Sequence, residues 1–283
     1  MIVCSLFLIL LLLFPEITGC GSKNGLFLWA TVLVPSLLPF SVLTSLLRTK
    51  LAKTRWKWIL LVAGLLSGYP IGAKVVTDLY HDGALSYEQC LFFLCSINNP
   101  SPMFVLSFVG DNILHLGTGK YLFYLCLVFS SFLSSFCLMQ LLRFHAPNRT
   151  TACSHTDSNP SFIEEWDTQI CNSALLLIKI GGYIMFFSIL TEFINHLIFL
   201  PVTVRLPLCG LLEITTGNVM INTAGLSPHM QIILSLAFTA FGGLCATAQT
   251  NSGIRNTGLS IFPYLGAKLL SAIFAALFGF IFW

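Results

Sequence analysis

The stretch "LLSGYPIGAKVV", residues 65 to 76, interrupts an apolar segment with Ser-Gly-Tyr-Pro-Ile-Gly and then adds a lysine, Lys74. Apolar segments dominate the chain, since 56% of its 283 residues are hydrophobic, only 9% are charged, and the mean hydropathy is +0.86. Water-soluble domains carry about 25% charged residues. We therefore predict an all-α polytopic membrane protein whose surface contacts the lipid bilayer.

Nine apolar segments have lengths near the roughly 20 residues that a membrane-spanning helix needs. They are residues 2–19, 25–47, 57–80, 89–110, 120–142, 173–199, 203–223, 229–250 and 258–283. One long polar interval has the Pro, Ser, Thr and Asn content of a solvated linker. These features divide the chain into an N-terminal transmembrane helix, a first repeat, a polar linker and a second repeat, over residues 1–24, 25–142, 143–171 and 172–283.

The basic residues indicate the orientation in the membrane. Five of the fourteen crowd the loop after the second apolar segment, namely Arg48, Lys50, Lys53, Arg55 and Lys57. The positive-inside rule places this loop, and with it the N-terminus, in the cytoplasm. The formal charge of +3 comes largely from this loop. It therefore indicates topology and contact with anionic lipid, and we expect no binding of nucleic acid.

The N-terminus allows a second interpretation. Residues 17–20, "ITGC", resemble the lipobox of bacterial lipoprotein signal peptides, in which Cys20 would become the lipidated N-terminus. A signal peptide normally begins with positive charge, whereas "MIVCS" has none. We therefore favour a first transmembrane helix that ends between Pro15 and Gly19, while cleavage of residues 1–19 remains open.

Cysteine and histidine give no sign of a metal or redox site. The ten cysteines contain no CxxC pair, and the six histidines show no pair at ligand spacing. Free cysteine in an apolar segment behaves as a small hydrophobic residue. No Ser/His/Asp or Cys/His constellation falls within the apolar core either. We predict no metal, no cofactor and no enzymatic activity.

The two halves share an order of motifs, which internal repeats of secondary transporters would explain. "FSVLTSLL" at 40–47 is echoed by "FSILTEFI" at 187–194. In each half, two interruptions of apolar segments follow: "SGYPIGAK" and "INNPSPMF" in the first, "CGLLEITTG" and "AFGGLCATAQTNSG" in the second. Four crossings per repeat would make the repeats parallel, whereas one re-entrant segment leaves three crossings and inverts them.

The interruptions are expected to face the protein interior, because bare lipid cannot satisfy open backbone groups. Pro70 and Pro100 suit the first position of a half-helix, and Asn99 suits the N-cap of the second. Half-helix N-termini carry partial positive charge. Two of them converging at mid-membrane would bind a carboxylate or another anion.

Two charged residues accompany the interruptions. Lys74 needs a partner in the membrane, either Asp78 in a structural pair, an anionic substrate, or Glu213. Glu213 would carry a coupling proton or sodium ion, or would simply accept hydrogen bonds around Thr215 and Thr216. Tyr69 would stack on a planar ligand or form hydrogen bonds in the core. Weaker signals come from Lys268, which could snorkel, and from the polar run "QTNSG" at 249–253.

Four of these motifs together resemble those of a known family. "GLFLWATVLVPSLLPFSVL", "LLSGYPIGAKVV", "INNPSPMFV" and "GLLEITTG", in this order, resemble the sporulation integral membrane proteins of the YlbJ type, built on the nucleoside-recognition Gate domain. The resemblance implies a relation to concentrative nucleoside transporters and a role in carrying dipicolinic acid, a small planar dicarboxylate, across the outer forespore membrane. It implies these substrate-binding residues: Ser67, Gly68, Tyr69, Pro70, Gly72, Lys74, Asn98, Asn99, Pro100, Ser101, Glu213, Thr215, Thr216, Gly242 and Gly243.

We therefore expect two Gate-like repeats whose broken or re-entrant helices meet at a midplane site. The predicted function is transport of a small organic anion, with dipicolinic acid as the implied substrate. The alternatives are a nucleoside-type transporter, which would bind a planar heteroaromatic substrate, and a receptor or scaffold that does not transport. The coupling ion, H+ or Na+, and a homo-oligomeric state remain open.

Overall fold

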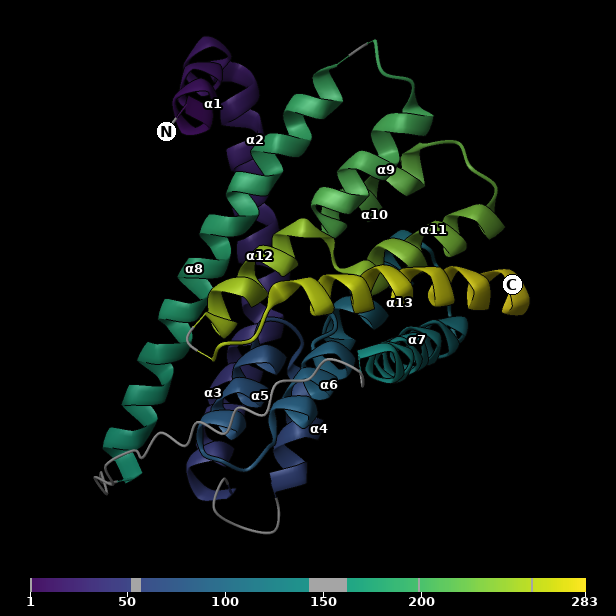
Figure 1. Ribbon diagram of the computed structural model, residues 1–283. Helices are drawn as coiled ribbons and strands as arrows, with labels where there is room; N and C mark the ends of the chain where they lie inside the picture. The colour runs from purple at the N-terminus through teal and green to yellow at the C-terminus, as the bar shows by residue number, and fades with distance from the viewer. Residues whose placement is uncertain (1, 52–56, 143–161, 198, 256) are drawn as a thin grey trace.

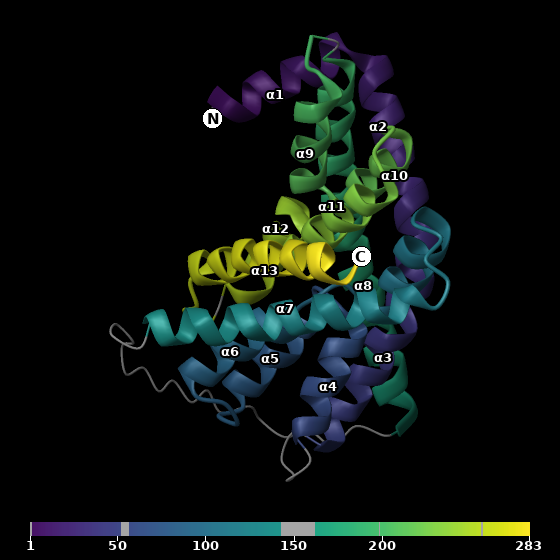
Figure 2. The same cartoon turned by 90° about the vertical axis from the view of Figure 1, so that its right-hand side faces the viewer.

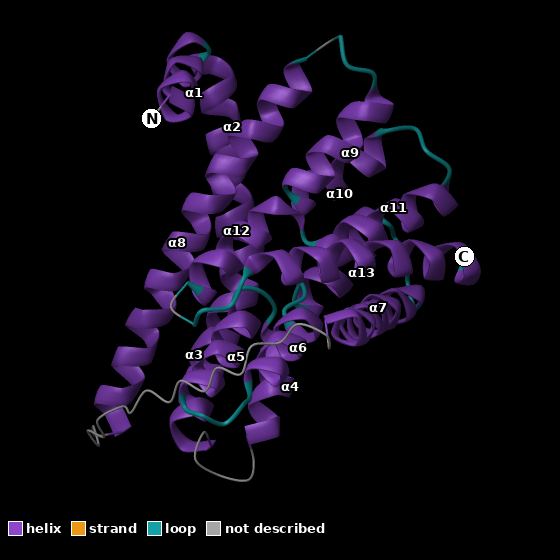
Figure 3. Cartoon of the chain, viewed as in Figure 1, coloured by secondary structure: helices purple, strands orange, loops and turns teal. Residues whose placement is uncertain are grey.

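The computed structural model describes residues 2–51, 57–142, 162–197, 199–255 and 257–283, which form helices joined by short loops and contain no strand (Figure 3). Within these described residues, five helical spans are long and apolar enough to cross a membrane: Pro15–Arg48, Gly119–Leu141, Trp166–His196, Pro228–Ile254 and Ile261–Phe282. Large apolar side chains such as Phe129, Phe262 and Phe280 are exposed on the outside of these spans. The predicted all-α membrane protein is confirmed.

The first helices differ from the predicted boundaries. Helix α1 spans Ile2–Leu13, and α2 (Pro15–Leu28), the π-helical η1 (Trp29–Leu33) and α3 (Val34–Leu51) then form one continuous span. The break falls at Phe14 because Pro15 begins the next helix without needing a donor at its nitrogen. We predicted that the first apolar segment would run to residue 19, and this is wrong: at twelve residues, α1 is only about 18 Å long.

Glycines allow α2 to pack closely against α8 (Phe162–His196), the longest described helix. A Cβ atom added at Gly21 would lie 2.7 Å from the Cα of Ile189, and one at Gly25 would lie 2.8 Å from the Cα of Met185. Gly21 and Gly25 thus form a close helix–helix contact, as small residues do in membranes. Figure 1 shows α2 and α8 running side by side.

A helical hairpin follows α3. Helices α4 (Lys57–Ser67) and α5 (Ile71–His81) are joined by three residues and pack against each other. A Cβ atom at Gly64 would lie 3.5 Å from the Cα of Gly72, so the chain folds back on itself at the connection. The hairpin leads to α6 (Tyr87–Ile97), whose N-terminus has a capping box of Ser86 and Gln89. The loop 52–56, with Lys53 and Arg55 of the predicted cytoplasmic cluster, lies outside the described residues.

An interrupted helix and a long helix complete the first half. Four residues without helical structure, 98–101, separate α6 from a segment that continues as the π-helical η2 (Phe104–Ile113). Helix α7 (Gly119–Leu142) then crosses the molecule. Residues 143–161 of the predicted linker lie outside the described residues, and α8 already begins at Phe162, inside the interval expected as linker.

The second half contains the same kinds of elements. Helices α9 (Val202–Leu212) and α10 (Ile214–Thr223) fold back at Glu213. A Cβ atom at Gly217 would lie 2.4 Å from the Cα of Gly210, and the ring of Phe238 fills the space beside Gly210. Helix α11 (Pro228–Phe241) is followed by α12 (Gly243–Ile254) and α13 (Ile261–Phe282). Helices α13 and α7 pack together across the bundle, and α11 packs on both of them (Figure 2). The short helices lie between this layer and the α2–α3 and α8 pair.

The contact between α2 and α8 can be tested with one methyl group. Gly25→Ala puts a Cβ within 2.9 Å of the Cβ of Ser188, so we expect the free energy of unfolding to fall by about 1–3 kcal/mol. Gly19 lies in the same helix with nothing within 4 Å. Gly19→Ala should leave the Tm in detergent unchanged or raise it, since alanine favours helices. Equal Tm values for the two variants would contradict the close packing.

Candidate functional site

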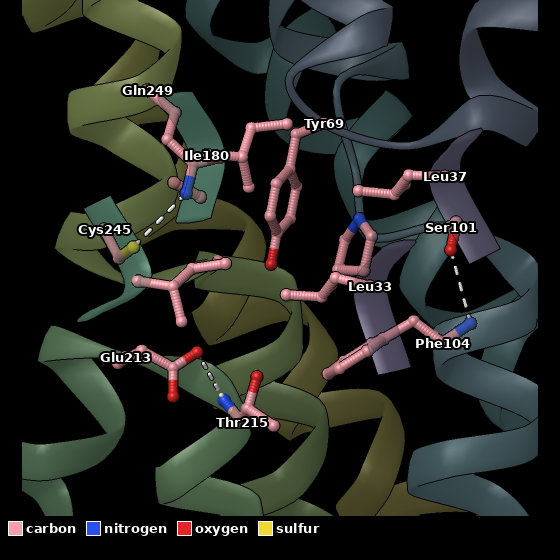
Figure 4. A pocket seen from close by; sticks show the side chains of 14 residues that line it. Leu33, Leu37, Tyr69, Ser101, Phe104, Ile180, Glu213, Thr215, Cys245 and Gln249 are labelled. Atoms are coloured by element: carbon pink, nitrogen blue, oxygen red, sulfur yellow. Dashed lines mark hydrogen bonds between the residues drawn. The ribbon is translucent and has the colours of Figure 1, made fainter. Parts of the chain in front are cut away.

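All four interruptions contribute residues to one cavity, the inner cavity, at the centre of the molecule (Figure 4). Its volume is about 30 Å³, which is room for roughly one water molecule. The lining residues are Leu33, Leu37, Tyr69, Pro100, Ser101, Phe104, Ile180, Ile184, Glu213, Thr215, Gly242, Cys245, Ala246 and Gln249. Segments that are distant in the sequence thus surround one small space, whose mostly apolar lining includes a few polar groups.

The tip of the first hairpin lies directly on the second interruption. Gly68 has a φ of +78°, and a Cβ atom there would lie 2.6 Å from the backbone nitrogen of Ser101. The amide of Tyr69 donates to the carbonyl oxygen of Asn99 at 2.8 Å, and Tyr69–Pro70 is a cis peptide. Ser67 holds the end of α4 through its hydroxyl, which lies 2.8 Å from that of Thr44. The tip is therefore fixed against residues 99–101.

Asn98 links three helices through its fully buried side chain. Its Oδ1 accepts from the amide of Ala73 at 3.0 Å, in the first turn of α5. Its Nδ2 donates to the hydroxyls of Thr250 and Tyr264, at 2.9 and 3.0 Å. Gly72 lets α5 approach this residue, because a Cβ atom there would be 3.2 Å from the Cα of Asn98. Asn98 therefore joins α5, α12 and α13, and it accepts a hydrogen bond from a backbone amide in the first turn of α5.

Asn99 does not cap the second half-helix, contrary to prediction. Its Oδ1 accepts from the hydroxyl of Ser131 at 2.8 Å and from the Nζ of Lys268 at 2.6 Å. The capping residue is Ser101, whose hydroxyl accepts from the amide of Phe104 at 3.3 Å. The helical residues accordingly begin at 102, so Pro100 is not their first residue either. The prediction failed because Asn99 is drawn into a buried network that spans the two halves.

Lys268 is the residue that the sequence interpretation misplaced most. The sequence allowed Lys268 to snorkel, yet the residue is only 1% exposed, in the middle of α13. Its Nζ lies 5.5 Å from the ring centre of Tyr264 as well as 2.6 Å from Asn99, and no described carboxylate forms an ion pair with it. A signal was available, because Tyr264, Lys268 and Ser271 follow the i, i+4, i+7 spacing of one helix face.

Glu213 caps α10 with its own carboxylate. Its Oε1 and Oε2 accept from the amides of Thr215 and Thr216, at 2.9 and 2.7 Å. This is the structural alternative that the sequence left open, in which neighbouring backbone amides bind the carboxylate. The side chain is only 4% exposed and still lines the inner cavity, next to Thr215. The partial positive charge at this helix N-terminus is therefore already occupied by the chain itself.

Lys74 forms no ion pair with either of its predicted protein partners in the described part of the chain, although its charge acts on the neighbouring Asp78. Asp78 pairs instead with Arg48, at 3.0 Å between Oδ2 and Nη1. Glu213 lines the inner cavity, whereas Lys74 lines a second cavity of about 260 Å³ together with Pro70. The expectation that Lys74 pairs with Asp78 or Glu213 is therefore wrong within the described residues, and the anionic substrate remains as its predicted partner.

The predicted residues thus fall into three groups. Those that line the inner cavity are Tyr69, Pro100, Ser101, Glu213, Thr215 and Gly242. Those that shape the interruptions without lining it are Ser67, Gly68, Gly72, Asn98, Asn99, Thr216 and Gly243. Gly243 packs its backbone against Leu212, where a Cβ atom would lie 3.0 Å from the carbonyl oxygen. Pro70 and Lys74 form the third group, in the second cavity.

Two polar groups in the inner cavity have no protein partner. The hydroxyl of Tyr69 points into the cavity and forms no hydrogen bond with a described residue (Figure 4). The Oε1 of Gln249 is buried without a partner, while its Nε2 lies 3.3 Å from the sulfur of Cys245. Gln249 belongs to the polar run that the sequence indicated. Ile180 and Ile184 of α8 were missed, because nothing in the sequence distinguishes them from residues facing lipid.

Comparison with known proteins supports the resemblance seen in the motifs. The chain is similar to the sporulation integral membrane protein YlbJ of Bacillus subtilis (strain 168), with 24% identity over 321 aligned positions that cover 95% of this chain and 78% of the relative. The predicted YlbJ-type resemblance is thereby confirmed. No family model matches the chain, and no solved structure gives a significant match.

The contact between hairpin tip and interruption yields a second test. In Gly68→Ala the added methyl group would clash with Ser101, whereas Gly83, at a similar φ of +71°, has nothing within 4 Å. Both variants incur the cost of a left-handed alanine, about 1–2 kcal/mol. Gly68→Ala should lose about 1–3 kcal/mol more. Thermal unfolding in detergent measures the difference, and equal losses would show that the tip does not touch residues 99–101.

Proposed function

We propose that this chain is a membrane transporter of a small organic anion. The observation that carries the proposal is that all four backbone interruptions line one buried cavity. Non-helical backbone is tolerated at membrane depth where it lines a cavity or is buried in protein. Transporters place substrate and ion sites between discontinuous helices near the bilayer midplane. A purely structural core would gain nothing from leaving Tyr69 and Gln249 with unpaired polar groups.

We further propose that the two halves are inverted repeats. Each half contains a long helix, a hairpin of two short helices, an interrupted helix and a second long helix, in that order. The helices of the hairpins have ten or eleven residues, or about 15–17 Å, so each hairpin enters and leaves on one side. Three crossings then remain in each half, which reverses the orientation of the second repeat relative to the first.

The inner cavity supports an alternating-access mechanism for this transporter. At about 30 Å³ it cannot hold a planar dicarboxylate, so substrate binding requires that the hairpin tips move apart. The tip at Tyr69 and the tip at Glu213 lie on opposite sides of the cavity (Figure 4). Glu213 would act as the coupling group, because its carboxylate is the charged group that lines the cavity. Its protonation would then depend on the charge of whatever enters.

Dipicolinic acid is the substrate we propose, carried across the outer forespore membrane during sporulation. The support is the resemblance in the motifs together with the similarity to a protein named for sporulation. A planar aromatic ring would also stack on Tyr69. A nucleoside would use the same ring and the neutral polar groups of Gln249 and Thr215, so a nucleoside-type transporter is the second candidate. A receptor or scaffold would bind the ligand without moving it.

Uptake by proteoliposomes tests the proposal. Purified protein should accumulate labelled dipicolinate, while uridine and adenosine, assayed in parallel, should not enter above the level of empty liposomes. Uptake of nucleosides alone would favour the second candidate, and binding without any flux would contradict transport.

Glu213→Gln tests coupling in the same assay. It removes the charge but keeps the size, so we expect the pH dependence of uptake to be lost while exchange of substrate across the membrane continues. Glu192→Gln is the matched control, because this glutamate lies in α8 beside His196, away from the inner cavity. A pH profile of Glu213→Gln that equals the wild-type profile would assign Glu213 to capping α10 alone.

A further inference from the structure

The larger cavity of about 260 Å³ lies beside α5, α8 and α12, and its charged lining is not explained by the inner cavity. It is lined by Pro70, Lys74, Thr77, Asp78, His81, Leu176, Lys179, Ile180, Tyr183, Gln249 and Gly253. Helix α12 packs against both α5 and α8 (Figure 1). We call this space the dilysine cavity, after Lys74 and Lys179.

Each helix presents one face to the dilysine cavity. On α5 the lining residues 74, 77, 78 and 81 follow helical spacing, and on α8 the residues 176, 179, 180 and 183 do the same. Lys74 comes from the first half of the chain and Lys179 from the second. Lysines from two different helices thus line one space, as a two-point binding site requires.

The charges around the dilysine cavity are not balanced. Neither Lys74 nor Lys179 forms an ion pair or hydrogen bond with any residue in the described ranges. The nearby carboxylates of Asp78 and Asp82 contact Arg48, at 3.0 and 3.4 Å. An unpaired charge at membrane depth is costly. Lys74 is partly buried and Lys179 is exposed. Together with Arg48 they outnumber the two carboxylates, so an anionic ligand would offset the excess positive charge beside this cavity.

We infer that the dilysine cavity binds a small rigid dianion with two carboxylates, one held by Lys74 and the other by Lys179. The inference deepens the proposed function and rests on it for the identity of the ligand. The cavity volume approaches the lower end of small-molecule sites, about 300 Å³. Thr77 and Tyr183 add hydroxyl groups on the two walls, and Pro70 closes the end near the hairpin tip.

The dilysine cavity adjoins the inner cavity. Ile180 and Gln249 line both spaces, so these two side chains form the partition between them. Arg48 ends α3 where the basic loop follows, and it contacts Asp78 and Asp82 at the far end of α5. The dilysine cavity therefore lies between the predicted cytoplasmic face and the inner cavity. A dianion bound by the lysines would lie next to the partition that it must pass to reach the inner cavity.

Binding measurements on the purified full chain test this site. The probes are pyridine-2,6-dicarboxylate and pyridine-2-carboxylate, which share the ring and differ by one carboxylate. Lys179→Gln should weaken binding of the dicarboxylate about tenfold, the usual contribution of one charged hydrogen bond, and reduce the preference over the monocarboxylate. Lys74→Gln should do the same. Lys179→Arg should keep most of the affinity. Lys23→Gln is the control, because this lysine of α2 is exposed like Lys179 but lines neither cavity.

A second measurement uses the wild-type protein and needs no variant to fold. Saturating pyridine-2,6-dicarboxylate should protect Lys74 and Lys179, but not Lys23, from an amine-reactive reagent, as read by mass spectrometry. The same experiment in nanodiscs of neutral lipid and of phosphatidylglycerol separates the ligand from lipid headgroups. Protection by phosphatidylglycerol alone would mean that the lysines bind lipid, which would overturn the inference.

The outcomes separate this inference from the proposed function. If liposomes accumulate dicarboxylate but the glutamine variants keep the wild-type preference for two carboxylates, the dilysine site is wrong and transport stands. If the lysines bind and are protected but no flux occurs, the site stands and the transporter does not. If wild-type protein neither binds nor transports the dicarboxylate, both are refuted.

Discussion

The two buried asparagines at 98 and 99 are the constraint on which the rest of the site depends. An interruption in the membrane leaves backbone groups that no lipid can satisfy. Here both asparagine side chains are fully buried, and they bind the amide of Ala73, the hydroxyls of α7, α12 and α13, and the ammonium of Lys268. The backbone oxygen of Asn99 then fixes Tyr69. The interruption is stable because both halves of the chain supply its partners.

This arrangement changes how an anion would be recognised. Sequence reasoning gave the positive charge to half-helix N-termini, but the chain itself occupies three of them: Asn98 at α5, Ser101 before η2 and Glu213 at α10. Groups that already accept hydrogen bonds there compete with any ligand. Lys74 and Lys179 form no ion pair or hydrogen bond within the described residues. We therefore expect the lysine side chains to bind an anion more strongly than the helix N-termini do.

The sequence predicted what depends on local composition and missed what depends on which face a residue occupies. Hydropathy was sufficient to predict an integral membrane protein. Gly, Pro and Asn inside apolar segments located the interruptions. The close contact of Gly21 and Gly25 with α8 was not predicted, because no local pattern shows which helix packs against them. The sequence does not distinguish Lys74 from Lys268, because both are lysines within apolar helices. Only tertiary packing shows that Lys268 is buried against Asn99, 169 residues away in the sequence.

The small inner cavity with Glu213 and the larger cavity with the two lysines are separate spaces in this fold. The inner cavity holds one carboxylate, whose oxygens are already bonded to amides, and it is too small for more than about one water molecule. Placing both lysines there would create a tight internal ion pair that no anion could easily break. Lys74 and Lys179 lie instead beyond Ile180 and Gln249, where the proposed dianion would meet the lysines before it meets Glu213. The partition keeps the two lysines apart from Glu213, so that they do not form an ion pair with it.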